Sequence, residues 1–144
     1  MAEQNYANHV KWVPAFHFFA MPVLLLNLGE SIYRLFGRGL SFGAVVDVLT
    51  AAALAALLFL ARLFALRVQD RVIRLEERLR MERLLPADVK PRIEEFTSAQ
   101  LVELRFASDG ELPELARKVL SDKIQGTKAI KLMVRNWRAD YLRA

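Results

Sequence analysis

The 144-residue sequence contains no cysteine, two histidines, and few charged side chains in its first 61 residues. Without cysteine the chain has no disulfide, no cysteine-ligated zinc, no iron–sulfur cluster and no thiol nucleophile. The sequence also lacks the G-x-x-x-x-G-K-[ST] phosphate loop, the G-x-S-x-G nucleophile elbow, the H-E-x-x-H zinc helix and the dinucleotide-binding glycine pattern. We therefore expect a protein that is not an enzyme and that uses no cofactor.

Charge is divided unevenly along the chain. Residues 1–61 carry three basic and three acidic side chains, whereas residues 62–144 carry 18 and 13, so the net charge of +5 lies wholly in the second part. An apolar part joined to a charged part is typical of a membrane anchor that carries a water-facing domain. We predict a polar docking segment over 1–12, a membrane anchor over 13–61 and a cytoplasmic helical domain over 62–144.

The predicted anchor contains two apolar runs. Residues 13–36 and residues 42–61 contain 24 and 20 residues, and a helix of either length can cross about 30 Å of hydrocarbon. Gly37 and Gly39 are expected to end the first helix and Ser41 to cap the second, with a loop of five residues between them. The predicted fold class is all-α: a transmembrane helical hairpin whose second helix continues into a small cytoplasmic helical domain.

Basic residues around the two runs predict the orientation. Seven arginines lie between positions 62 and 83, whereas the predicted loop region offers only Arg34 and Arg38. The positive-inside rule then places both termini in the cytoplasm, which for a bacterium means an inner-membrane protein. A secretory signal peptide is the main alternative for the first run, but the segment MAEQNYANHV has no lysine or arginine and so lacks the basic n-region of such a peptide. A soluble hairpin buried in a partner protein is the other alternative.

The remaining sequence has the periodicity of helices. Neither glycine nor proline occurs between Arg62 and Leu85, so the second helix is expected to continue as far as Pro86. It carries an apolar stripe that must pack on something, and i,i+4 charge pairs of Glu76 with Arg80 and Arg78 with Glu82. The stripe consists of Ala65, Val68, Val72, Leu75 and Leu79.

Three shorter helices are predicted after Pro86. Thr97 or Ser98 can cap the first, Asp109 the second, and Gly126 with Thr127 marks the start of the third. Their apolar residues recur at helical spacing, which is enough for a small bundle. The third helix is expected to carry a stripe formed by Ile130, Met133, Val134, Trp137 and Tyr141.

Three ionisable residues fall within or beside the apolar runs. Glu30 and Arg34 are four residues apart and can pair on one helix, and Asp47 lies near the start of the second run. Ionisable groups at membrane depth are costly, so they are often functional. A polar lock of the hairpin, with Asp47 facing the Arg38 loop, is the favoured interpretation. A small ion or proton transporter, or a channel component, is the alternative function.

Small residues are frequent in the second run. Ala51 and Ala55, and also Ala52 and Ala56, are four residues apart, a spacing that lets two helix backbones approach closely in lipid. This surface is expected to pack on the first helix, on another copy of the chain or on a different membrane subunit.

Basic residues in the second part of the chain are candidates for contacts with lipid headgroups or with a partner. Nucleic-acid binding is not expected, because no recognised motif accompanies the short basic patches. Attraction to anionic lipid fits the same charges, and a plain solvated helix face is the simpler alternative. The candidates are Arg62, Arg67, Arg71, Lys128, Lys131, Arg135 and Arg138.

Aromatic residues flank the first run. Trp12, Phe16 and His17 are expected to lie at headgroup depth, where amphipathic rings gather. His17 is also a conceivable axial haem ligand. A metal site is not predicted, because His9 and His17 do not share a helix face.

Several segments together resemble an uncharacterised family of short bacterial two-span membrane proteins. These segments are Gln4-Asn5-Tyr6-Ala7-Asn8-His9, Lys11-Trp12-Val13-Pro14, Gln69-Asp70-Arg71, Leu104-Arg105-Phe106-Ala107-Ser108-Asp109 and Asn136-Trp137-Arg138-Ala139-Asp140-Tyr141. The resemblance implies a bacterial inner-membrane protein and transfers no catalytic or binding residue. The function that we expect is that of a non-enzymatic scaffold or accessory subunit in a homo-oligomer or a larger membrane complex.

Overall fold

The computed structural model describes residues 5–6 and 11–141, apart from the side chain of Arg38. Most of the predicted docking segment, including His9, lies outside the described residues. The described part of the chain is helical and contains no β-strand, so the predicted all-α class is confirmed. Contacts divide the chain into an N-terminal unit, Lys11–Leu66, and a C-terminal unit formed mainly by Arg67–Ala144.

The first helix begins as a π-helix, η1 (Ala15–Ala20), and continues as α1 (Met21–Arg38). Gly37 lies within α1, so the prediction that it breaks the helix is wrong. Gly39 ends α1, because its φ of 87° is open to glycine at little cost. The connection is therefore only Gly39–Ser41. The Ser41 hydroxyl accepts a hydrogen bond from the Ala44 N–H at 3.2 Å and caps the next helix, as predicted.

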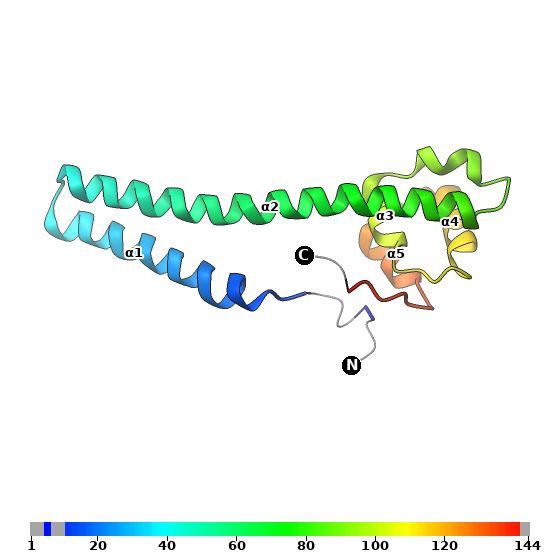
Figure 1. The fold of residues 1–144 in the computed structure, drawn as a ribbon, viewed down its shortest axis with the longest axis horizontal. Coiled ribbons are helices and arrows are strands. Elements are labelled where there is room, and N and C mark those ends of the chain that lie inside the picture. Colours follow the sequence, from blue (N-terminus) through cyan, green and yellow to red (C-terminus); the bar gives the residue numbers. More distant parts are fainter. Residues whose placement is uncertain (1–4, 7–10, 142–144) are drawn as a thin grey trace. The chain divides into compact units, whose positions relative to one another are not determined.

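Helix α2 (Phe42–Leu84) is a single helix of 43 residues (Figure 1). The prediction that this helix continues close to Pro86 is confirmed, because it ends at Leu84. Two helical segments in the described residues, Ala15–Gly37 and α2, are long and apolar enough to cross a membrane by length and composition. Helix α2 therefore passes from an apolar segment into a charged one without a break in its backbone hydrogen bonds.

The C-terminal unit contains η2 (Lys90–Glu95), a 3₁₀-helix, and the helices α3 (Ser98–Leu104), α4 (Leu112–Ser121) and α5 (Thr127–Met133). Thr97 caps α3 as predicted: its hydroxyl accepts from the Gln100 N–H, and the Gln100 side chain accepts from the Thr97 N–H. Asp109 does not cap α4, because its carboxylate binds the guanidinium of Arg80 instead. The cap position of α4 belongs to Glu111.

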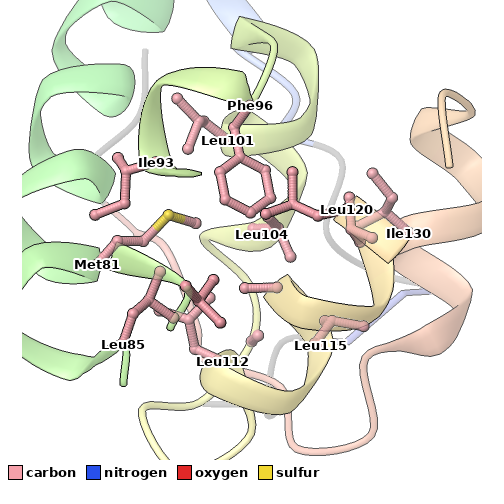
Figure 2. Close-up of a cluster of buried hydrophobic side chains, with 14 residues drawn as sticks. Met81, Leu85, Ile93, Phe96, Leu101, Leu104, Leu112, Leu115, Leu120 and Ile130 are labelled. Carbon is pink, nitrogen blue, oxygen red and sulfur yellow. The ribbon is translucent and has the colours of Figure 1, made fainter. Parts of the chain in front are cut away.

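A single apolar core holds these helices together (Figure 2). Met81 in the last turn of α2 and Leu85, the residue that follows the helix, belong to this core together with buried side chains of η2, α3, α4 and α5. The core side chains that are wholly inaccessible to solvent include Met81, Leu101, Leu104, Leu112, Val119 and Ile130.

The predicted stripe on the second half of α2 does not enter this core. Val68, Val72, Leu75 and Leu79 are exposed, whereas Ile73 on the other face is buried. The packing partners of α2 within its own unit lie on the face that carries Ile73, Glu77 and Met81. A regular apolar stripe therefore remains uncovered by the described residues.

The last helix is much shorter than its sequence pattern predicts. Helix α5 ends at Met133, and Trp137 instead forms an antiparallel bridge with Ala107. The Glu111 carboxylate accepts the backbone N–H groups of Arg135 and Asn136, each at 2.8 Å. These two N–H groups are therefore not available for the backbone hydrogen bonds that would continue α5. A longer α5 would lose these contacts and the bridge of Trp137 with Ala107.

Leu112→Ala tests whether the C-terminal core stabilises the protein. Leu112 is fully buried, so its truncation should lower the free energy of unfolding by about 2–5 kcal/mol. The measurement is denaturant unfolding in mild detergent, followed by far-ultraviolet circular dichroism. Leu132→Ala, the same change at an exposed site of α5, should stay within about 0.5 kcal/mol of the wild type. Equal losses in the two variants would contradict the core described here.

Candidate functional site

Two of the three ionisable residues predicted in the anchor are joined. Arg34 Nε donates to Glu30 Oε1 at 2.6 Å, the i,i+4 pair expected from the sequence. Asp47 is exposed on α2 and makes no ion pair with any described residue. The predicted contact between Asp47 and the Arg38 loop falls on a side chain outside the described part of the chain. The structure thus supports a local polar pair and brings no three-residue cluster together.

The predicted interfacial aromatic residues form one cluster in the N-terminal unit. The Trp12 ring meets the His17 ring edge to face at 5.0 Å, and Phe16 meets His17 at 4.9 Å. The Arg62 guanidinium lies 5.8 Å from the centre of the Phe16 ring, within the range of a cation–π contact. One basic candidate and three aromatic candidates are therefore brought to the same place.

His17 uses one of its two ring nitrogens locally. Its Nδ1 lies 3.1 Å from the backbone nitrogen of Val13, one helical turn earlier. Only Nε2 would be free of this backbone contact for an axial ligand. Haem ligation by His17 stays a prediction, because no contact of His17 in the structure tests it.

The four alanines predicted to mediate helix packing are not equivalent. Ala51 and Ala55 are buried, Ala52 is half-buried and Ala56 is exposed. One small-xxx-small pair, Ala51 with Ala55, is thus buried, whereas Ala52 and Ala56 are not covered as a pair.

The basic residues near the C-terminus do not form the helix face that their spacing predicts. Because α5 ends at Met133, only Lys128 and Lys131 lie on it. Lys131 Nζ is 3.1 Å from Glu103 Oε2, an ion pair without hydrogen-bond geometry, and Arg138 pairs with Glu77. Lys128 and Arg135 are exposed, as are Arg67 and Arg71 on α2. The four C-terminal residues therefore do not share one helix, and their contact with lipid headgroups or a partner stays a prediction.

A buried carboxylate on α2 organises a charged cluster that the sequence does not reveal. Glu77 is only 4% exposed, and its two oxygens accept from Arg80 at 2.9 Å and from Arg138 at 3.3 Å. Arg80 also donates to Asp109 at 2.8 Å and to the backbone oxygen of Ala107 at 2.6 Å. Arg80 thus joins α2 to the turn between α3 and α4.

A buried arginine, Arg105, holds the C-terminal segment. Arg105 Nε donates to Asp140 at 3.0 Å, and its guanidinium lies over the Phe106 ring at 4.2 Å. Trp137 stacks on the same ring with the centroids 4.5 Å apart. The Ser108 N–H donates to the Asn136 oxygen across the bridge. Stacking and backbone pairing together fix the segment after α5 against the turn that follows α3.

Burial raises the pKa of the Glu77 carboxyl above its usual value of 4.5, because the charged form loses its hydration. The guanidinium of Arg80 opposes this shift most strongly, and Arg138 and Arg105 oppose it more weakly. Desolvation is the largest effect, so Glu77 is more costly to ionise in the folded protein than in the unfolded chain.

A groove of about 1000 Å³ lies beside this cluster. One wall is the second half of α2, with Val72, Glu76 and Leu79, and the other is the segment Arg138–Tyr141. Its lining combines apolar side chains with both signs of charge, which suits an amphipathic protein segment better than a small anion. Among the described residues no group of three histidine, aspartate or glutamate side chains could hold a metal ion.

Sequence reasoning missed the charged cluster because it paired residues along α2 only. It assigned Arg80 to Glu76 and Arg78 to Glu82, whereas Arg80 binds Glu77 and Asp109 and Arg78 binds Glu94. The partners Asp109 and Ala107 lie nearly thirty residues away along the chain. No local spacing indicates such contacts.

Comparison with known proteins assigns the chain to a family but not to an activity. The chain belongs to the Family of unknown function (DUF6526), whose model matches residues 1–144. No curated protein and no solved structure matches it significantly. The membership confirms the resemblance to an uncharacterised family, and the roles of individual residues rest on the geometry described above.

Glu77→Gln tests the buried carboxylate through the pH dependence of stability. A group whose pKa is raised on folding stabilises the folded state while protonated, and that contribution is lost as pH rises from 4.5 through the raised pKa. Relative to the wild type, the variant should lack this loss between pH 4.5 and neutral pH. Thermal unfolding in mild detergent at several pH values measures it.

The matched control is Glu114→Gln, a change at an exposed carboxylate of α4. It should keep the wild-type pH dependence. An identical pH dependence in Glu77→Gln and the wild type would show that Glu77 does not titrate differently in the folded protein.

Proposed function

We propose that this protein is a two-span inner-membrane protein whose helical hairpin anchors a cytoplasmic docking domain, and that it acts as a scaffold or accessory subunit rather than as an enzyme. The observation that carries this proposal is the change in character along α2. Its first half is apolar and largely uncovered, whereas its last turn supplies Met81 to the core of the C-terminal unit, which the following residue, Leu85, also joins. One helix thus serves as anchor and as structural element of the domain.

Exposure of the apolar helices supports a lipid environment. In the most apolar 18 residues of the first helix, only 6% are buried within the structure. In the most apolar 18 residues of α2, only 11% are buried. Large side chains such as Leu26, Leu49 and Leu57 are more than half exposed. Soluble monomers rarely expose contiguous apolar surfaces of this extent, whereas a bilayer would cover them.

The covered positions support pairing of the two helices as a hairpin. On α1, Leu24, Leu28 and Ser31 are less exposed than their neighbours and recur at steps of four and three. On α2 the buried pair is Ala51 and Ala55, small residues that permit close approach. The short connection Gly39–Ser41 requires the two helices to reverse direction within three residues.

The charge distribution supports a cytoplasmic position of the C-terminal unit. Seven arginines follow the apolar half of α2, and arginine and lysine are retained on the cytoplasmic side of a membrane. Exposed Arg67 and Arg71 lie within ten residues of its end, where anionic headgroups would attract them. The Arg62 contact with Phe16 places an aromatic ring beside the first of these charges.

The chemistry of the C-terminal unit supports docking. Its buried charged groups, Glu77, Glu103 and Arg105, each form an ion pair within the chain. Such paired groups fix a shape more readily than they perform proton transfer. The groove and the exposed apolar residues of α2 remain as surfaces for another protein segment.

Labelling of single cysteines tests the topology, because the wild-type chain contains no cysteine to interfere. Leu40→Cys lies in the connection between the helices, and Lys118→Cys lies on an exposed face of α4. In intact bacterial spheroplasts a membrane-impermeant maleimide should label Leu40→Cys and leave Lys118→Cys unlabelled until the cells are lysed.

Both variants should sediment with the membranes and should dissolve only with detergent. Labelling of Lys118→Cys in intact spheroplasts would overturn the orientation, and recovery of the protein in the soluble fraction without detergent would overturn the anchor. A denatured sample of each variant, labelled to completion, controls for the reactivity of the two cysteines.

A further inference from the structure

The aqueous half of α2 presents an apolar surface that its own unit does not cover. This exposed stripe consists of Val68, Val72, Leu75 and Leu79, whose exposed fractions are 61%, 49%, 61% and 47%. In the same stretch of helix Ile73 is only 6% exposed. The stripe is therefore separate from the core face of α2, and two of its members, Val72 and Leu79, border the groove beside the segment Arg138–Tyr141.

The spacing of the stripe is that of a coiled-coil seam. Its members follow one another at steps of four, three and four residues, the alternation of the a and d positions of a heptad. At about 100° per residue, the stripe lies on the side of α2 opposite Ile73, Glu77 and Met81. The face that packs into the C-terminal core and the face that carries the stripe can thus be used at the same time.

We infer that the exposed stripe of α2 pairs with the same stripe of a second copy of this chain as a short parallel coiled coil. This inference rests on the proposed function, because two copies anchored in one membrane with the same orientation present their α2 helices in parallel. In one heptad register Val72 and Leu79 occupy a positions, and Val68 and Leu75 occupy d positions.

Charge complementarity favours a second copy as the occupant. In this register Arg71 is a g residue and Glu76 is the e residue five positions later, the two positions that face each other across a parallel coiled coil. Both side chains are exposed, and neither makes an ion pair within the described residues of its own chain. Two-fold symmetry would form this opposite-charge pair twice.

The next pair in the register is less favourable but is compensated. It places Arg78 beside Arg83 of the second copy, and Arg78 is already paired with Glu94 of its own chain at 2.7 Å. Four apolar residues per chain amount to about two heptads, which is short for a coiled coil in free solution. Confinement to one membrane raises the effective concentration of the two stripes and offsets this shortness.

Disulfide cross-linking of single-cysteine variants tests the pairing in native membranes. Leu75→Cys lies on the seam, and Asp70→Cys is an exposed position on the other side of the same helix. Under mild oxidation Leu75→Cys should form a covalent dimer at least about tenfold faster than Asp70→Cys, because bridged residues need Cα atoms within about 7 Å. The dimer should have twice the mass of one chain.

A charge exchange in the Leu75→Cys background tests the register without relying on the apolar residues. Arg71→Glu alone places two acidic groups opposite each other and should slow cross-linking about fivefold. The double change Arg71→Glu with Glu76→Arg restores opposite charges and should restore the rate. A folding defect would not be repaired in this way.

Three outcomes overturn the inference. These are equal cross-linking of Leu75→Cys and Asp70→Cys, a Leu75→Cys adduct with a different protein in place of the covalent dimer, or a double charge exchange as slow as the single one. If the topology labelling succeeds while cross-linking fails, the membrane anchor stands and the self-pairing does not. If the protein proves soluble, the proposed membrane anchor is wrong. A Leu75→Cys cross-link that still forms faster than the Asp70→Cys cross-link would then show that the stripes pair without an anchor.

Discussion

The continuity of α2 is the constraint on which the rest of the structure depends. A backbone hydrogen-bond ladder that runs from Phe42 to Leu84 joins a stretch in which apolar side chains face outward to one in which Met81 enters a core. The apolar half of this helix is largely uncovered by the described residues, so it would expose a large apolar surface to water. The proposed bilayer would cover this surface, and a continuous helix satisfies the backbone polar groups that lie within it.

Around the end of α2 the chain closes a small core that is stiffened by buried charge. Glu77 is expensive to bury, and it is held by Arg80 of the same helix and by Arg138, which lies 61 residues further along the chain. Removal of one partner would leave an uncompensated charge, so such a cluster specifies one arrangement more strongly than it adds stability. The stacked rings of Phe106 and Trp137 serve the same end without charge. The cluster and the stacked rings keep the chain after α5 extended.

The same helix that is buried on one side remains open on the other. The side that carries Ile73 and Glu77 is used within the chain, and the side that carries Val68 and Leu75 is available to a partner. A scaffold needs this combination, because a surface can be offered to another molecule only if the element that carries it is already held in place. Membership of a family of unknown function leaves this physical argument as the basis of the functional proposal.

The sequence by itself determined the features that depend on near neighbours: the two apolar helices, the unbroken run to Leu84, the caps at Ser41 and Thr97, and the ion pair of Glu30 with Arg34. These follow from spacing, hydropathy and capping chemistry within a few residues. Only the tertiary structure decided the rest. It ended α5 at Met133, moved Arg80 from Glu76 to Glu77 and Asp109, and left the α2 stripe uncovered. Glu111 and Trp137 act across long separations, and a local pattern contains no information about which distant group will compete for a backbone donor or a charge.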